Sequence, residues 1–127
     1  MHVTLWVLQI ILGIYFMVLG VLHFIIPPNL PQPMTWFYDL SPLLHYFSGS
    51  AEILGSLGLI LPGLTKIQTR LTPLAGLGLA LLMIGAAGYH IIRGEFQNLP
   101  TNIVLFTISA YIAYGRWNKH PLPTSKP

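Results

Sequence analysis

The stretch from residue 3 to residue 26, "VTLWVLQIILGIYFMVLGVLHFII", contains no Asp, Glu, Lys or Arg. A transmembrane helix needs about 20 predominantly apolar residues, so this stretch is long enough to cross a bilayer. It is too long for the apolar core of a signal peptide, and it lacks a basic N-terminal region and a small-residue cleavage site. We therefore predict an uncleaved transmembrane helix.

Proline and glycine divide the rest of the chain into three more apolar segments. "PPNLPQP" ends the first helix, because proline cannot continue a helix. The later helices are predicted at residues 43–61, 73–92 and 101–114, the first of these ending at "PG". Only 7% of the residues are charged, against about 25% in soluble domains. The sequence thus predicts an all-α bundle of four transmembrane helices over residues 1–117, followed by a polar, proline-rich tail, residues 118–127.

The basic residues indicate how this bundle is oriented. By the positive-inside rule, the loops and tails that carry most Lys and Arg lie in the cytoplasm. Both termini are therefore predicted to be cytoplasmic, in the inner or plasma membrane of a prokaryote. No basic patch with interleaved aromatic residues suggests nucleic-acid binding. The basic residues of the cytoplasmic side are Lys66, Arg70, Arg116, Lys119 and Lys126, and Arg93 is alone on the other.

The first outer loop, residues 27–42, is the longest connection between the predicted helices. Its motif "MTWFYDL" is amphipathic and rich in aromatic residues. Segments of this kind lie in the interface between headgroups and acyl chains. We predict a short interfacial helix here.

Glu52 lies near the middle of the second predicted helix. An acidic residue at that depth costs about 2.5 to 3.5 kcal/mol on insertion scales. It shares a face with His45, Gly49 and Ser56, at spacings of three and four residues, and Ser48 lies on the same side. This face is predicted to point into the bundle. Glu52 then either ties the helices together through hydrogen bonds from Ser48 and Ser56, or contacts a ligand.

Three histidines, His23, His45 and His90, are predicted to fall in the same outer half of the membrane. If the polar faces point inward, these side chains surround the mouth of a cavity that has Glu52 as its floor. Three His and one Glu could bind a metal in principle. However, no short His-x-x-His pair is present, and Glu52 lies about 10 Å along its helix from His45. We therefore predict no metal site.

The motif "YHIIRGE" places more polar groups at the outer end of the third helix. His90 and Arg93 share a face by their spacing, and Arg93 could reach the carboxylate of Asp39. The motif is either an anchor in the interface or a polar lip, at which Tyr89 and His90 would hydrogen-bond a quinone-type carbonyl. A bound quinone or lipid is the cofactor that these residues suggest.

The sequence shows no nucleophile–base–orienter triad, no phosphate-binding loop and no metalloprotease motif. It contains no cysteine, which excludes disulfides, thiol redox chemistry and covalent c-type haem. These observations favour a role other than catalysis.

The segments "LGVLHFIIPP", "SGSAEILGSLGLILPG", "AGLGLALLMIGAAGYHIIRGE" and "AYGR" resemble the DoxX-like membrane proteins, and the similarity spans almost the whole chain. Glu52, among small residues of the second helix, is the most family-like feature. The resemblance implies a compact four-helix bundle. It implies no catalytic residues. It does imply association with other membrane subunits, because the family takes its name from subunits associated with a thiosulfate:quinone oxidoreductase.

Two main hypotheses follow. The chain is an accessory subunit of a larger redox or quinone-linked membrane complex, with other membrane proteins and lipid as its partners. Alternatively, it binds a quinone-like apolar molecule on its own, or serves as an oxidoreductase component, through an intramembrane pocket at Glu52 and the outer histidines. A small transporter or proton path is less favoured, because the chain shows no inverted repeat or broken helix.

Overall fold

The computed structural model describes residues 2–123, and every regular element in that range is helical. This confirms the predicted all-α bundle of four long helices with a short helix in the first long loop. Lys126 and the rest of the predicted tail beyond residue 123 lie outside the described residues. The long helices are α1 (His2–Ile25), α2 (Pro42–Thr65), α3 (Leu71–Ile92) and α4 (Leu99–Tyr114). The short elements are the 3₁₀ helices η1 (Gln32–Asp39) and η2 (Phe96–Asn98) and the π-helical turn η3 (Gly115–Lys119).

Within the described residues, three helices, α1, α2 and α3, are long and apolar enough to cross a membrane. The fourth, α4, has 16 residues and runs directly into η3. The prediction that α2 ends before "PG" is wrong, because α2 continues through Pro62 to Thr65. Pro62 has no N–H to donate to the carbonyl of Gly58, one turn earlier. Thr72 of α3 supplies the missing donor, since its hydroxyl donates to the Gly58 carbonyl at 2.7 Å.

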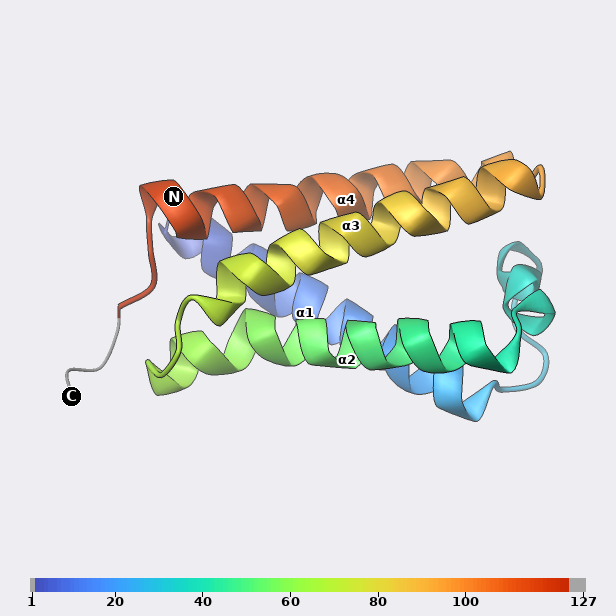
Figure 1. Ribbon diagram of the computed structural model, residues 1–127, viewed down its shortest axis with the longest axis horizontal. Helices are drawn as coiled ribbons and strands as arrows, with labels where there is room; N and C mark the ends of the chain where they lie inside the picture. Colours follow the sequence, from blue (N-terminus) through green and yellow to red (C-terminus); the bar gives the residue numbers. More distant parts are fainter. Residues whose placement is uncertain (1, 124–127) are drawn as a thin grey trace.

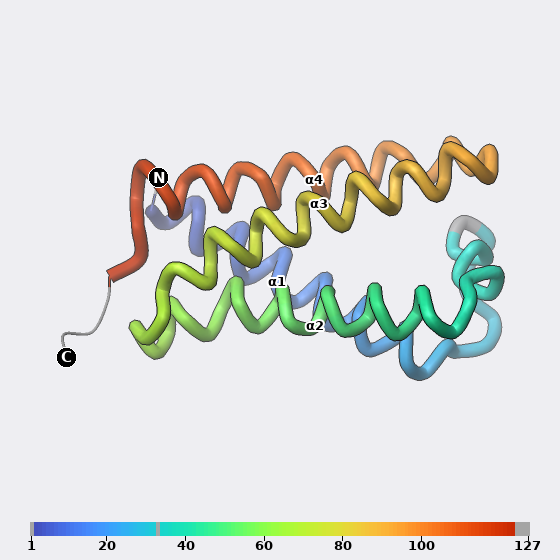
Figure 2. The backbone as a smooth tube through the Cα atoms, viewed as in Figure 1, coloured from blue at the N-terminus to red at the C-terminus, as the bar shows by residue number. Residues whose placement is uncertain are grey.

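The four helices form two antiparallel hairpins, α1 with α2 and α3 with α4 (Figure 1). The start of α1 and the end of α4 lie at the same end of the bundle, which we call the terminal end (Figure 2). The opposite end carries η1, and we call it the η1 end. The two hairpins approach each other at the terminal end and separate toward the η1 end (Figure 1).

Small residues allow the helices within each hairpin to pack closely, as in other membrane bundles. Gly20 and Gly49 lie where α1 crosses α2, and a Cβ added to Gly49 would be 2.9 Å from the Gly20 carbonyl oxygen. In the other hairpin, a Cβ added to Gly76 would be 2.8 Å from the carbonyl oxygen of Ser109. At both crossings a backbone carbonyl oxygen is among the atoms in the way, so a larger residue would force the helices apart.

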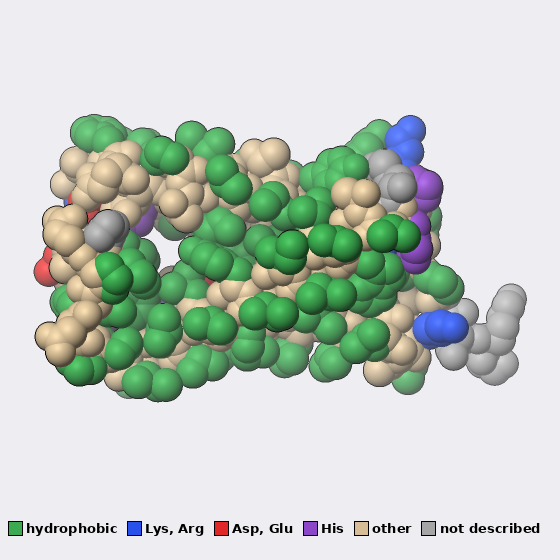
Figure 3. Space-filling view, turned by 180° about the vertical axis from the view of Figure 1, so that it is seen from behind, with side chains coloured by type: hydrophobic (Ala, Val, Ile, Leu, Met, Phe, Trp, Pro, Cys, Tyr) green, Lys and Arg blue, Asp and Glu red, His purple; other side chains and the backbone are tan. Residues whose placement is uncertain are grey.

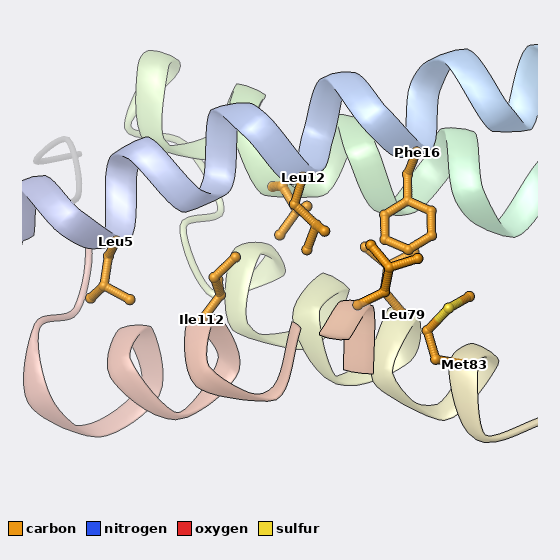
Figure 4. Packing of buried hydrophobic residues seen from close by; sticks show 8 residues of the cluster. Leu5, Leu12, Phe16, Leu79, Met83 and Ile112 are labelled. Carbon is orange, nitrogen blue, oxygen red and sulfur yellow. The ribbon is translucent and has the colours of Figure 1, made fainter. Parts of the chain in front are cut away.

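Apolar side chains fill the terminal half of the bundle. Leu5 and Leu12 of α1 lie near Ile112 of α4, and Phe16 lies near Leu79 and Met83 of α3 (Figure 4). Leu5, Phe16 and Ile112 are fully buried. The cluster stops near the level of Met83, and the hairpins separate beyond it.

Arg116 closes the terminal end, and it is 2% exposed. Its Nε donates to the side-chain oxygen of Gln9 at 2.6 Å, and its Nη1 donates to the carbonyl of His120 at 2.9 Å. Nη1 also lies 2.9 Å from Nδ1 of His2, and the guanidinium stands over the ring of Trp6. One side chain therefore joins the start of α1 to the segment that follows η3.

We expect Arg116→Lys to lower the free energy of unfolding by about 1 kcal/mol, because a single ammonium cannot reproduce the planar fork of donors. Thermal unfolding in detergent measures the effect. Lys119→Ala is the matched control, since Lys119 is an exposed basic residue of the same turn. Equal melting temperatures for the Arg116→Lys variant and the wild type would contradict this account of the terminal end.

Candidate functional site

A cavity of about 590 Å³ lies between the two hairpins toward the η1 end. The space-filling view shows the molecule hollowed at this end (Figure 3). Most of its wall is apolar, and the described residues that line it include no Lys or Arg. The polar side chains on the wall are Tyr15, His23, Trp36, Ser48, Glu52, Tyr89, His90, Asn98, Thr101 and Asn102.

Glu52 begins a chain of polar contacts that runs through two histidines to the backbone of η1. Its Oε1 lies 3.2 Å from Nε2 of His23. Nδ1 of His23 lies 2.9 Å from Nδ1 of His45, and Nε2 of His45 lies 2.9 Å from the carbonyl oxygen of Phe37. Glu52, His23 and His45 are buried, each with no more than 3% of its surface exposed. The chain is thus enclosed by protein over its whole length.

The end of this chain fixes where its protons lie. A carbonyl oxygen can only accept, so Nε2 of His45 carries a proton, and in neutral His45 Nδ1 is an acceptor. His23 must then donate from its own Nδ1, which turns its Nε2 toward Glu52. The contact between Nε2 and the carboxyl is favourable when the two groups share one proton, either as carboxylic acid and imidazole or as carboxylate and imidazolium. Both forms are neutral overall, as a group inside the membrane requires.

Two buried polar atoms on the cavity wall have no hydrogen-bond partner among the described residues. One is Oε1 of Glu52, for which the His23 contact does not form a full hydrogen bond. The other is the amide nitrogen Nδ2 of Asn102, on the opposite hairpin. An unsatisfied buried polar group costs about 1 to 3 kcal/mol, so such groups in a native structure require an explanation. Both atoms could be satisfied by a molecule in the cavity.

The short helix η1 spans the gap between the hairpins at this end. Phe37 is fully buried and stacks on His23 with ring centres 4.5 Å apart. The neighbouring Trp36 meets His90 of α3 edge-on, at 4.8 Å between ring centres. Asp39 pairs with Arg93 at 2.7 Å, a contact that the sequence left as a possibility. The element therefore contacts both hairpins and covers the end of the cavity.

Glu95 organises the connection from α3 to η2. Its Oε1 accepts from Nδ1 of His90 at 2.9 Å, and its Oε2 accepts from Nε of Arg93 at 3.1 Å. Burial alone would raise the pKa of Glu95, but these two hydrogen bonds and the two nearby positive groups hold its pKa below the ordinary value. The hydrogen bond from Arg93 to Glu95 also raises the pKa of Arg93. The loop is thus fastened by an ionised carboxylate.

This lowered pKa predicts an acid-sensitive loop. A carboxyl whose pKa is lower in the folded state stabilises the fold above its ordinary pKa of about 4.3, and the stabilisation is lost as the pH falls through the folded value. Below about pH 4 we expect a loss of up to about 1 kcal/mol after allowance for solvent screening. The melting temperature of the wild type should fall there relative to that of Glu95→Gln. Parallel pH profiles for the two proteins would show that Glu95 does not fasten the loop.

The structure brings together most of the residues that the sequence singled out. Glu52, His23, Ser48, Tyr89 and His90 line the cavity. His45 lies behind His23, off the wall, and Arg93 and Asp39 form an ion pair at the η1 end, also off the wall.

Ser56 differs from the expectation, because its hydroxyl donates at 2.8 Å to the carbonyl of Ile53 in its own helix and does not bond Glu52. A serine hydroxyl in a helix readily satisfies itself in this way. Tyr15 and Asn102 also line the cavity and were missed as site residues. Asn102 lies on the polar face of the last helix, which could have indicated it, whereas Tyr15 lies off the small-residue face of α1.

Comparison with known proteins agrees with this architecture. No curated protein and no solved structure matches the chain. The sequence model of the DoxX-like family matches residues 7–112, a range that begins within α1 and ends within α4. The match covers Glu52, the histidines of the polar chain and Asn102. This small, multi-pass membrane protein therefore belongs to the DoxX-like family.

Proposed function

We propose that the protein binds a neutral, lipid-soluble molecule of the quinone class inside the membrane, with Glu52 as the principal polar contact. The observation that carries the proposal is Oε1 of Glu52, which is buried on the wall of a largely apolar cavity and makes no full hydrogen bond, its one contact being with Nε2 of His23 at 3.2 Å among the described residues. Ligand sites typically occupy about 300 to 1,000 Å³ and combine apolar walls with a few polar groups. The cavity, at about 590 Å³, has both properties.

The charges on the wall support a neutral ligand. Glu52 is the only acidic residue among the described residues that line the cavity, and Nε2 of His23 lies 3.2 Å from its Oε1. Among the described residues, no lysine or arginine lies on the wall to pair with a phosphate or carboxylate ligand. A quinone or quinol needs no counter-ion, and its oxygens can accept from Asn102 and exchange a hydrogen bond with Glu52.

The aromatic and sulfur-containing side chains of the wall suit a flat ring. Trp36 and Tyr89 lie on the η1 side, Tyr15 lies on α1, and Met83 lies at the boundary with the apolar core. Aromatic faces and thioethers both make favourable contacts with an aromatic ring. The wall thus offers ring contacts around a small number of polar groups.

Trp36 provides a direct test, because it is the tryptophan on the cavity wall. In a Trp6→Phe, Trp117→Phe background, a short-chain quinone should quench Trp36 fluorescence in a saturable manner. Non-specific quenching by quinone dissolved in the bilayer is measured with a Trp6-only protein, whose tryptophan lies at the terminal end. Equal, non-saturating quenching of the two tryptophans would overturn the proposal.

A second candidate role is that of accessory subunit in a redox or quinone-linked complex, as the family resemblance implies. The observation that favours it is a groove of about 210 Å³ on the α1–α2 hairpin, lined by Gly13, Met17, Leu57 and neighbouring residues, with almost no polar surface. A partner helix could pack there through close contact with small residues. Purification from native membranes in mild detergent tests this role. A strictly solitary protein would count against it.

We also propose that both termini face the cytoplasm of a prokaryotic cell. Lys66, Arg70, Arg116 and Lys119 belong to the loop and turn at the terminal end, whereas the η1 end carries Arg93 paired with acidic residues. The chain has no cysteine, so single cysteines can be introduced without background. A membrane-impermeant thiol reagent applied to intact cells should label Gln97→Cys and spare Gln68→Cys. The reverse pattern would invert the orientation.

A further inference from the structure

Two glycines of α3, Gly78 and Gly85, line the cavity but serve no packing contact within the protein. A Cβ added to either of them would meet nothing within 4 Å. Gly76 and Gly55 contrast with them, because a Cβ there would lie within 2.8 Å of Ser109 and 2.7 Å of Leu79 respectively. The space over Gly78 and Gly85 is therefore open.

Open glycines in a helix carry a cost. Glycine is about 1 kcal/mol less favourable than alanine in a helix interior, and tight packing elsewhere in the bundle repays that cost. Gly78 and Gly85 lie two helical turns apart and so on one face. Their absent side chains leave a shallow track along α3, on the wall that also carries the unpartnered atoms of Glu52 and Asn102.

The track is continuous with the surface that faces lipid. Leu81, between the two glycines, lines the cavity and is 59% exposed. On α2, Phe47 lines the cavity and is 63% exposed, and Leu44 is also on its wall. Residues that belong both to a cavity wall and to the outer surface mark an opening. The cavity therefore opens sideways between α2 and α3.

We infer that the ligand enters from the bilayer through this opening and that its apolar tail lies over Gly78 and Gly85, with its polar head at Glu52. This inference rests on the proposed function and narrows the ligand to a neutral head with a hydrocarbon tail. The head is held where buried polar atoms lack partners, and the tail lies where side chains are absent. The described residues of the wall include no Lys or Arg to hold a phosphate, which disfavours a phospholipid as the specific occupant.

Leucine substitutions test the position of the tail. Gly78→Leu and Gly85→Leu fill the track, and Gly88→Leu is the matched control. Gly88 lies on the same helix, and its Cβ position is equally open, but it does not line the cavity. All three variants remove one helical glycine, so their effects on helix stability should be similar. Melting temperatures verify that each variant folds.

The probes are a benzoquinone without a tail and the same quinone with a decyl tail, measured in lipid nanodiscs by quenching of Trp36. Partitioning into lipid favours the decyl probe equally for every variant, so comparison among variants cancels it. Gly78→Leu and Gly85→Leu should weaken binding of the decyl probe by about tenfold or more, as expected for filling an occupied space. The tail-less probe should keep its affinity within about threefold, and Gly88→Leu should change neither.

The outcomes separate this inference from the proposed function. If the wild type binds the tail-less probe but Gly85→Leu and Gly88→Leu bind the decyl probe equally, the tail lies elsewhere and the inference fails alone. If neither probe binds the wild type, the proposed function fails and the inference fails with it. Displacement of the decyl probe by decanol as readily as by the quinone would show an opening filled by bulk lipid chains. If Gly78→Leu or Gly85→Leu loses a co-purifying subunit while its quinone binding is unchanged, the track binds a partner helix. Displacement by decanol and loss of a subunit would each overturn the inference.

Discussion

Replacement of Glu52 by glutamine is expected to weaken quinone binding by about ten- to hundredfold, the usual cost of losing a hydrogen bond to a group that can carry charge. The amide is nearly the same size as the carboxyl, and its nitrogen can donate to Nε2 of His23. The chain of contacts through His45 to Phe37 would therefore be retained. However, an amide cannot share a proton with His23 or pass one to a ligand. Titration of Trp36 fluorescence with the tail-less quinone measures the loss.

Ser56→Ala is the matched control for this substitution. Ser56 is a buried polar residue one helical turn after Glu52, but it lies off the cavity wall and bonds its own helix. Its removal should leave quinone affinity unchanged. A Glu52→Gln protein that binds quinone normally but unfolds at lower temperature would assign Glu52 a purely structural role.

Replacement of Gly49 by alanine is expected to lower the free energy of unfolding by about 1 to 3 kcal/mol, the usual cost of overpacking. The added Cβ would lie 2.9 Å from the carbonyl oxygen of Gly20 and 2.9 Å from the Cβ of His23. Neither atom is the flexible end of a side chain, so α1 and α2 would have to separate. The separation would also pull His23 away from His45 and Glu52, and quinone binding should weaken together with stability.

Gly88→Ala controls for the change in helix propensity, because a Cβ at Gly88 meets nothing within 4 Å. It should unfold at or slightly above the wild-type temperature. Denaturation in a mild detergent, followed by circular dichroism, compares the two variants. If Gly49→Ala proves as stable as Gly88→Ala, close contact between Gly20 and Gly49 does not hold the first hairpin together.

Periodicity predicted the helices and their inward faces because both depend on local spacing. Gly49 and Glu52 share a face through the geometry of a single helix, so the sequence alone could place them together. Their contacts with α1 depend on how two helices cross. The contacts from Glu52 through His23 to His45 could therefore not be predicted from the sequence, although all three residues were recognised as candidates.

The separation of the hairpins was also not predictable from the sequence. Glycines that pack, such as Gly76, and glycines that face open space, such as Gly85, look alike in an apolar segment. Only their surroundings distinguish them. The extension of α2 through Pro62 had the same kind of cause, because the donor that compensates for the proline is Thr72, on another helix. Tertiary contacts decided each of these cases.

Photolabelling tests most directly the claim that the cavity between the hairpins binds a quinone. An azidoquinone with a short tail, activated in the membrane, should label residues of the cavity wall, which lie within 15–23, 34–52, 78–90 and 98–105, and excess unlabelled quinone should suppress the labelling. Mass spectrometry of peptides locates the modified residues. Saturable labelling confined to those segments of the cavity wall is the predicted result. Labelling of the groove at Gly13 and Met17, or labelling that unlabelled quinone does not suppress, would contradict the claim.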